Sequence, residues 1–342
     1  MKNVTDIHRQ EIIDYSPPGE EIKRIGSSFF RGSQVNFNPY RKDFAHPGFL
    51  AKFLLQGWVP DGPVIDQQTS VTAFGSCFAQ NITDHLGKAG YNLSSGRNPN
   101  IYISKMGEGL VNVHAIAQQF QWALEDAKVP EGLWHGWKAE EFGYDESIRQ
   151  QTREVFRATD FFVITLGLSE VWFDELTGGV FWRAVPLKSY DPDRHKFRVC
   201  SVEETRSGIA WIYHTIRKHV PNAKVLFTLS PIPLAATFRP VSCITANSVS
   251  KAILRAALDE FIRGHHQELN ANLFYFPSYE IITELFFAKY GDDGRHPAPE
   301  IIEMIMKLFE ATYCRSKLTM VEIEMLYKDL RKKNAATALA GA

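Results

Sequence analysis

The chain has 342 residues, of which 44% are hydrophobic and 23% charged, and its formal net charge is −1. This much apolar material can bury a sizeable core, and the near-zero charge excludes the strongly basic footprint typical of nucleic-acid-binding proteins. Because no apolar stretch approaches the roughly 18 residues of a membrane span and charges interrupt the N-terminus, we expect a cytoplasmic protein without a membrane span or secretory leader.

The first 65 residues are rich in Pro, Gly, Asn and aromatic residues and show little periodicity. We expect residues 1–65 to form an irregular arm packed on the core, not a separate domain. The main domain is expected over residues 66–315. Residues 316–342 are expected to hold a charged helix at about 319–334, followed by a flexible tail.

From residue 70 onward, short β-branched or aromatic runs recur, each bounded by Gly, Pro or Ser, at residues 70–76, 91–95, 159–167, 223–231 and 272–278. Both faces of these runs are apolar, which predicts buried parallel strands. Amphipathic helical patterns lie between them, at residues 78–89, 114–126, 202–220 and 249–262. The alternation predicts an α/β fold: a doubly wound, flavodoxin-like five-stranded parallel sheet in three αβα layers.

Two insertions interrupt the main domain, at residues 128–150 and 168–200. The first is polar and aromatic, too irregular for a strand. His135, between two tryptophans of this insertion, is a candidate for lining a pocket. The alternative is that the loop packs on the core, as Trp-rich loops more often do.

The second insertion contains residues 170–185, which are typical of a hairpin because Gly178 and Gly179 can supply the turn. Trp172 and Trp182 in this stretch could offer a flat face to a sugar ring. The alternative is that they belong to a hairpin side facing the core.

The segment FGSCFA, residues 74–79, follows the first predicted strand directly. A serine at a strand-to-helix turn lies at the carboxyl edge of the sheet, where α/β folds bind their ligands. The positive end of the next helix can stabilise an oxyanion there, and Gly75 gives the backbone room to turn. The alternative is that Ser76 is only a helix N-cap.

The segment GDDGRHP, residues 291–297, lies in a Gly-rich loop after the last predicted strand. The spacing of Asp293 and His296 puts both side chains on one side of a turn. A carboxylate so placed can hold the tautomer and orientation of an imidazole that takes a proton from a serine. The alternative is an ordinary surface turn. Arg295 could bind an anionic group of a substrate, or it could be solvated.

The order and content of several segments resemble the GSCFA family, which belongs with the SGNH/GDSL-like hydrolases. They are FGSCFAQN from residue 74, TLG at 165–167, SPIPL at 230–234, NSVSKAIL at 247–254, YFPSYEI at 275–281 and DGRHP at 293–297. The resemblance covers about residues 70–310. The first of these segments is the most specific.

This resemblance implies that Ser76 is the nucleophile and that Asp293 and His296 are its relay. It also implies an oxyanion hole formed by backbone N–H groups of Ser76 and Gly96. The family pattern's third block, usually GxND, falls on a segment that begins at Gly167 and has Ser169 in place of the asparagine. Either Ser169 or Asn98 would have to replace that amide, a donor worth about 2.7–4 kcal/mol in such sites.

The four cysteines are scattered without a CxxC pair, at Cys77, Cys200, Cys243 and Cys314. We therefore expect reduced thiols and no thiolate metal site. No histidine has ligand spacing to other candidate ligands, so neither a metal nor a cofactor is expected. Cys77 could itself be a nucleophile at the helix start. Adjacent helical residues point about 100° apart, however, and the resemblance favours Ser76, with Cys77 as a small core residue.

The resemblance implies a serine esterase or acyltransferase that works through an acyl-serine on O-acyl, chiefly acetyl, groups of a carbohydrate. Its partner would be a small-molecule or saccharide ester. The alternative is a non-catalytic carbohydrate-binding or assembly protein on a degenerate SGNH scaffold, which the altered third block and the aromatic insertions suggest. A thiol enzyme using Cys77 is a third possibility. The sequence gives no indication of the oligomeric state.

Overall fold

The computed structural model describes residues 10–15, 23–28, 36–94, 100–105, 109–128, 133 and 145–340. The chain divides into two compact units, residues 1–46 and 47–342. In the first unit, β1 (Gln10–Tyr15) and β2 (Lys23–Ser28) pair antiparallel, and the 3-10 helix η2 (Asp43–Ala45) follows. The expected arm over residues 1–65 therefore differs from the structure: part of it is a hairpin, and residues 47–65 belong to the larger unit.

The larger unit is built on a parallel sheet with the strand order β3-β4-β7-β8. Its strands are β3 (Val71–Phe74), β4 (Phe161–Leu166), β7 (Lys224–Leu229) and β8 (Leu273–Phe276). Nearly every residue in them is buried, which explains their continuous apolar and β-branched sequences. Four of the five predicted strands are thus confirmed.

The remaining predicted strand, residues 91–95, is reduced in the described residues to one parallel bridge between Leu93 and Val71. The Val71 N–H donates to the Asn92 carbonyl at 2.9 Å. The prediction of five full strands is therefore not confirmed. The bridge lies on the side of β3 away from β4. Segments later in the chain therefore pair with β3 on both of its sides, as in a doubly wound sheet.

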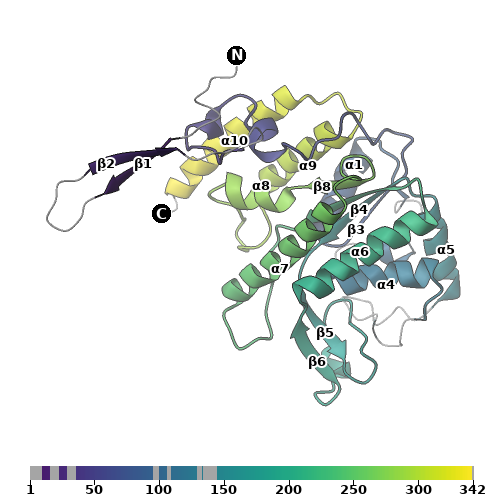
Figure 1. Cartoon of the computed structure of the whole chain (residues 1–342). Helices are drawn as coiled ribbons and strands as arrows, with labels where there is room; N and C mark the ends of the chain where they lie inside the picture. The colour runs from purple at the N-terminus through teal and green to yellow at the C-terminus, as the bar shows by residue number, and fades with distance from the viewer. Residues whose placement is uncertain are drawn as a thin grey trace. The chain divides into compact units, whose positions relative to one another are not determined.

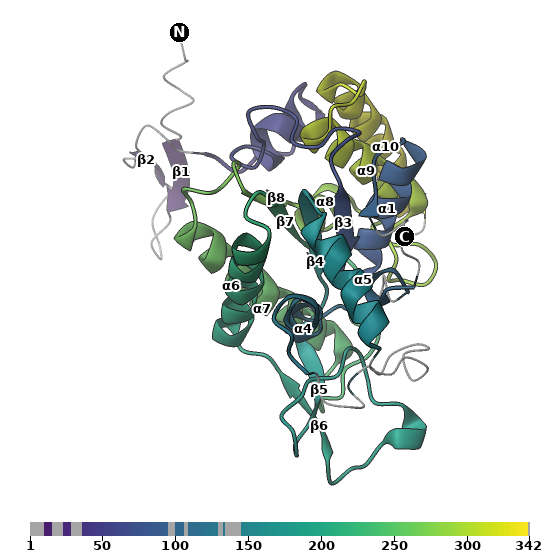
Figure 2. The ribbon, with the colours of Figure 1, turned by 90° about the vertical axis from the view of Figure 1, so that its right-hand side faces the viewer.

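Helices cover both faces of this sheet, as Figures 1 and 2 show. One layer contains α4 (Val113–Leu124), α5 (Glu146–Arg157), α6 (Val202–His219) and α7 (Cys243–Gly264), and the other contains α1 (Cys77–Lys88), α8 (Ser278–Leu285) and α9 (Pro299–Tyr313). Phe162 and Ile164 of β4 join the core under the first layer. On the opposite face, Phe276 of β8 packs against Phe309 of α9 with ring centroids 5.3 Å apart.

The second insertion forms a small sheet in which β5 (Glu170–Asp174) pairs antiparallel with β6 (His195–Val199). The predicted hairpin over residues 170–185 is therefore only partly correct. A turn does form around Gly178, whose φ of 72° suits glycine, but the returning strand is a single bridge from Phe173 to Val180. The 3-10 helix η5 (Leu187–Ser189) lies in the connection to β6.

The C-terminal helix α10 (Met320–Ala340) extends beyond the predicted 319–334 into the segment that was expected to be a flexible tail. It is anchored to the start of the larger unit, where the Leu50 N–H donates to Glu324 at 2.6 Å. The short elements η3 (Leu50–Leu54) and α3 (Tyr102–Lys105) complete the fold. Among the described helices, none is both long enough and apolar enough to cross a bilayer.

Candidate active site

Ser76 lies at the carboxyl end of β3 and is the N-cap of α1. Its Oγ accepts a hydrogen bond from the Phe78 N–H at 3.2 Å. The residue is 3% exposed. Ser76 is therefore a helix N-cap, and its hydroxyl lies at the positive end of α1.

Gly75 permits this position because the turn passes very close to β4. Its φ of 132° lies in a region that L side chains rarely adopt, and a Cβ there would collide with the carbonyl oxygen and Oγ1 of Thr165. A larger residue would push Ser76 away from the end of β4. Gly75 is therefore needed for the close approach of this turn to β4 as well as for the turn itself.

Thr165, on β4, holds Ser76 through two contacts. The Ser76 N–H donates to Thr165 Oγ1 at 2.6 Å, and the two hydroxyl oxygens are 2.9 Å apart. The parallel register that pairs Phe74 with Ile164 produces this arrangement. When the Thr165 hydroxyl donates to Ser76 Oγ, the proton of Ser76 remains available to a base.

A cavity of about 260 Å³ lies over the carboxyl ends of β3, β4 and β7. Ser76 and Cys77 contribute to it after β3, Gly167 and Leu168 after β4, and Ser230 after β7. Its other lining residues are Val111, Glu170, Trp172, Arg183, Ala184, Phe197, Ile232, Pro233, Leu234, Ala235, Ala236, Phe238 and Arg295. A cavity at this edge, between strands on either side of a change in winding direction, is where doubly wound folds bind substrates.

The predicted pair Asp293 and His296 forms a direct contact in the loop before α9. His296 Nδ1 is hydrogen-bonded to Asp293 Oδ2, and the Arg295 and His296 N–H groups both donate to Asp293 Oδ1 at 2.9 Å. These hydrogen bonds, chiefly the one from His296, hold the pKa of the Asp293 carboxyl well below its usual value. The other ring nitrogen, His296 Nε2, takes no part in these hydrogen bonds.

The loop that carries Asp293 and His296 reaches the cavity through Arg295. This side chain lines the cavity and donates from Nη2 to the Pro233 carbonyl at 3.3 Å. The imidazole of His296 is 52% exposed and is not among the lining groups. The structure therefore places the loop beside the serine's cavity, with Arg295 as the residue in contact with it.

Two predicted oxyanion donors after β4 are already engaged. The Gly167 N–H donates to the Val111 carbonyl at 2.8 Å. Ser169 is 1% exposed and is not among the residues that line the cavity. Its N–H and Oγ both donate to Ser250 Oγ, at 2.9 and 3.2 Å. Of the two alternatives for the missing asparagine, Ser169 therefore has both of its donors engaged by α7 in this structure.

Of the remaining predicted site residues, Gly96, Asn98 and His135 lie outside the described residues. Trp172 is one of the residues that line the cavity. Trp182 is not one of them: it is 0% exposed, and its Nε1 donates to Gln118 at 3.0 Å. Trp182 is thus a core residue, as the alternative for the hairpin tryptophans held.

Cys77 differs from its expected role as a core residue. Its side chain is partly exposed and lines the same cavity as Ser76. None of the four cysteines, all within the described residues, forms a disulfide. Two nucleophile candidates therefore share the cavity, which an experiment has to separate.

Lys251 of α7 was missed by the sequence analysis. It is 2% exposed, and its Nζ donates to the carbonyls of Gly167 at 2.7 Å and Ser230 at 2.8 Å. Burial, with a smaller contribution from the charge of Arg295, lowers the pKa of Lys251 to about 7. It precedes Leu254 and Leu258 by three and seven residues, so the helical spacing already placed it on the apolar face of α7.

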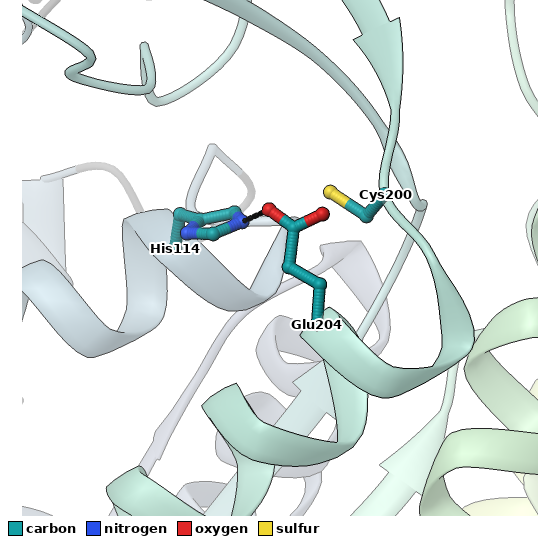
Figure 3. Close-up of side chains that lie close together, drawn as sticks. All are labelled: His114, Cys200 and Glu204. Atoms are coloured by element: carbon teal, nitrogen blue, oxygen red, sulfur yellow. Dashed lines mark hydrogen bonds and ion pairs between the residues drawn. The ribbon is translucent and has the colours of Figure 1, made fainter.

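A second cluster of titratable groups lies between α4, β6 and α6. His114, Cys200 and Glu204 hold their ligand atoms within 4.8 Å of one another (Figure 3). Both Glu204 oxygens also accept from Arg198, at 2.6 and 2.7 Å, and burial raises the pKa of the Cys200 thiol to about 12. A guanidinium therefore already neutralises the Glu204 carboxylate.

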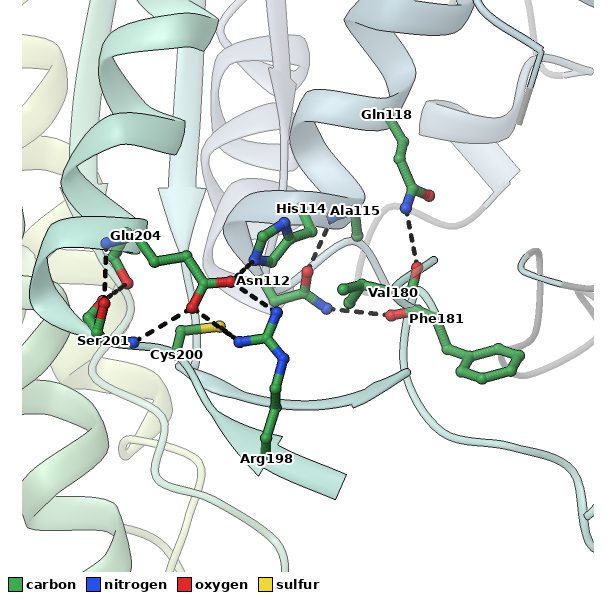
Figure 4. A network of polar contacts seen from close by, with 11 residues as sticks. Asn112, His114, Ala115, Gln118, Val180, Phe181, Arg198, Cys200, Ser201 and Glu204 are labelled. Atoms are coloured by element: carbon green, nitrogen blue, oxygen red, sulfur yellow. Dashed lines mark hydrogen bonds and ion pairs between the residues drawn. The ribbon is translucent and has the colours of Figure 1, made fainter. Parts of the chain in front are cut away.

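The same region ties the second insertion to the core (Figure 4). Asn112 caps α4 by accepting from the Ala115 N–H at 2.8 Å, and its amide donates to the Phe181 carbonyl at 3.3 Å. Gln118, six residues further along α4, donates to the Val180 carbonyl at 2.8 Å. These bonds fix the segment that leads into the cavity wall at Arg183 and Ala184.

The GSCFA family model matches residues 70–309 of this chain. No curated protein matches the sequence. Among solved structures, the chain is similar to an acetyl xylan esterase (Est2A) from the rumen bacterium Butyrivibrio proteoclasticus, with 15% identity and a TM-score of 0.31. The match covers 72% of this chain and 63% of the esterase chain, less than two thirds of its length. A similarity at this level says nothing about the activity of this chain.

Proposed function

Because this chain belongs to the GSCFA family, we propose that it is an SGNH-type serine esterase or acyltransferase acting on O-acyl groups, such as acetyl, of a carbohydrate. Ser76 is the nucleophile, and Asp293 and His296 are its relay. The main support is the position of Ser76, which caps α1 at the carboxyl edge of the sheet and lines a cavity shared with Arg295, the neighbour of His296.

In the proposed reaction, Ser76 Oγ attacks the carbonyl carbon of the ester while its proton passes to His296 Nε2. Collapse of the tetrahedral intermediate breaks the bond to the alcohol, which leaves with that proton, and the acyl group stays on Ser76. In an esterase, water then adds to the acyl-serine and releases the carboxylic acid. In a transferase, a second alcohol takes the acyl group.

Stabilisation of the oxyanion is assigned to the N-terminus of α1, a twelve-residue helix whose positive end lies at Ser76. The Ser76 N–H can take part only if it exchanges Thr165 Oγ1 for the substrate oxygen. Gly96 keeps its assignment as a donor from the family pattern alone. The engaged N–H of Gly167 and donors of Ser169 are not part of the proposal.

Hydrolysis of p-nitrophenyl acetate and of an O-acetylated xylo-oligosaccharide tests this function. We expect Ser76→Ala and His296→Ala each to lower kcat by about 10⁴-fold or more, as for other members of catalytic triads. Cys77→Ala, the matched control, should retain most of the activity. If Cys77→Ala abolishes turnover and Ser76→Ala does not, the chain is a thiol enzyme and the proposal is wrong.

The engagement of the donors near Gly167 supports a second candidate, a non-catalytic carbohydrate-binding or assembly protein on the same scaffold. Such a protein would bind a xylo-oligosaccharide in isothermal titration calorimetry and would hydrolyse neither ester faster than Ser76→Ala. Turnover that depends on Ser76 rules this candidate out.

A further inference from the structure

The cavity beside Ser76 is mostly apolar. Leu168 follows β4, and Ile232, Leu234 and two alanines come from the loop after β7. Polar side chains are a minority of the lining. A binding site for a sugar alone would present more hydrogen-bonding groups, because buried hydroxyls need partners.

Three aromatic rings form one wall of the cavity. Trp172 of β5 contacts Phe197 of β6 with ring centroids 5.5 Å apart and Phe238 with centroids 4.9 Å apart. Phe197 and Phe238 are 5.2 Å apart. All three pairs are tilted or edge-on, so the wall presents ring faces and edges together, an arrangement that accepts apolar groups of varied shape.

Phe238 is held in this wall although 57% of it is exposed. The residues on either side of it are both attached to Glu170: Thr237 Oγ1 donates at 2.7 Å, and Arg239 Nη1 lies 3.7 Å from the other carboxylate oxygen. Glu170 itself is 6% exposed. The Glu170 carboxylate therefore holds the backbone on both sides of Phe238 in place. An exposed apolar ring held in this way is available for contact with a ligand.

The size of the cavity exceeds what an acetyl group requires. Its volume is about 260 Å³, whereas an apolar protein cavity of about 150 Å³ binds benzene. An acetyl group would leave most of the apolar surface without contacts, which forfeits dispersion energy. The space fits a ring or a chain of several methylenes attached to the ester carbonyl.

We infer that this cavity holds the acyl group of the substrate, and that the preferred acyl group is apolar and larger than acetyl, of about the size of hexanoyl or benzoyl. The inference rests on the proposed function, since it requires the acyl-serine at Ser76. Phe238 is then a residue that determines specificity, and Glu170 positions it. The bonds that form and break are those of the acyl transfer described above.

Isomeric esters test this assignment, because they place the same apolar group on either side of the ester bond. Ethyl hexanoate and hexyl acetate are one such pair, and ethyl benzoate and benzyl acetate are another. We expect kcat/KM, followed by pH-stat titration, to be at least about tenfold higher for ethyl hexanoate than for hexyl acetate, since each buried methylene is worth about fourfold. The reverse preference would place the apolar group on the alcohol side and overturn the inference.

Phe238→Ala should lower the ratio of kcat/KM for ethyl hexanoate to that for ethyl acetate by about tenfold, through lost apolar contact. The matched control is Phe287→Ala, because Phe287 is 58% exposed and lies outside the cavity lining; it should leave the ratio unchanged. Thr237→Val, which removes one attachment to Glu170, should lower the same ratio by a smaller factor.

The outcomes separate the inference from the proposed function. If the wild type hydrolyses none of the esters faster than Ser76→Ala, the proposed function fails and the inference falls with it. If ethyl acetate is hydrolysed in a Ser76-dependent way and ethyl hexanoate is not, or if Phe238→Ala leaves the ratio unchanged, the inference alone is overturned.

Discussion

At the scale of single residues, three residues together fix the turn between β3 and α1. Gly75 allows close approach to β4, Ser76 caps α1, and Thr165 receives the Ser76 N–H. Sequence reasoning placed the glycine and the serine correctly, because strand-to-helix turns have local signals. Thr165 lies 89 residues away from Ser76, and only the strand register brings it there, which no local pattern encodes.

Thr165→Val should weaken catalysis without unfolding the protein, because valine keeps the shape of the side chain and removes the hydroxyl. We expect kcat for p-nitrophenyl acetate to fall about three- to tenfold, the worth of one ordinary hydrogen bond. Thr165→Ser, which keeps the hydroxyl, should restore most of the loss. An unchanged kcat in Thr165→Val would show that the threonine does not position Ser76.

Lys251 makes stability depend on pH in a direction set by its lowered pKa. Its pKa is about 7 in the folded protein against an ordinary value of 10.5. Between these values the unfolded chain binds more protons than the folded one, so the free energy of unfolding contributed by this group rises with pH, by up to about 1.4 kcal/mol per unit.

Urea denaturation of the wild type and of Lys251→Met from pH 6 to pH 9 measures this contribution. The wild type should gain stability relative to the variant above pH 7, and below pH 7 the difference should be constant. Parallel curves over the whole range would mean that Lys251 does not titrate in this window.

At the scale of elements, the second insertion supplies Trp172 and Phe197, two of the three rings of the aromatic wall, and depends on α4 for its position. Asn112 and Gln118 bind backbone carbonyls of residues 180–182, which precede the cavity-lining Arg183. The sequence indicated an insertion with a turn at Gly178. It did not reveal that β5 pairs with β6, because strands separated by a long connection leave no local sign of their pairing.

Two neighbouring glutamines of α4 give a matched test of this support. Gln118 accepts from Trp182 Nε1 and donates to Val180, whereas the Gln119 amide is buried without a partner among the described residues. Gln118→Leu should lower the free energy of unfolding by about 1–3 kcal/mol, because it strands a buried donor and acceptor. Gln119→Leu should be neutral or stabilising. Thermal denaturation with both variants checks this, and equal losses would contradict it.

At the scale of the whole molecule, the alternation of apolar runs and amphipathic helices predicted the parallel sheet and its two helix layers. Four strands match the predicted runs, since strands buried on both faces have continuous apolar sequences. The division at residue 46 could not be predicted, because composition changes little there. Nor could the engagement of Ser169 by Ser250, which depends on how α7 packs on the end of β4.

The larger unit, residues 47–342, contains the complete parallel sheet and every residue that lines the cavity. We therefore expect a chain of residues 47–342 to unfold cooperatively and to retain hydrolysis of p-nitrophenyl acetate within about threefold of the full chain. Loss of cooperative unfolding in this chain, by differential scanning calorimetry, would show that residues 1–46 belong to the folding unit.

The central claim is that the Ser76 hydroxyl attacks with the help of His296. The most direct measurement is reaction with a fluorophosphonate probe, followed by mass-spectrometric mapping of the modified peptide. The account predicts one adduct, on Ser76, that is absent in Ser76→Ala and forms at least about 10³-fold more slowly in His296→Ala. An adduct on another residue, or labelling of His296→Ala at the wild-type rate, would contradict it.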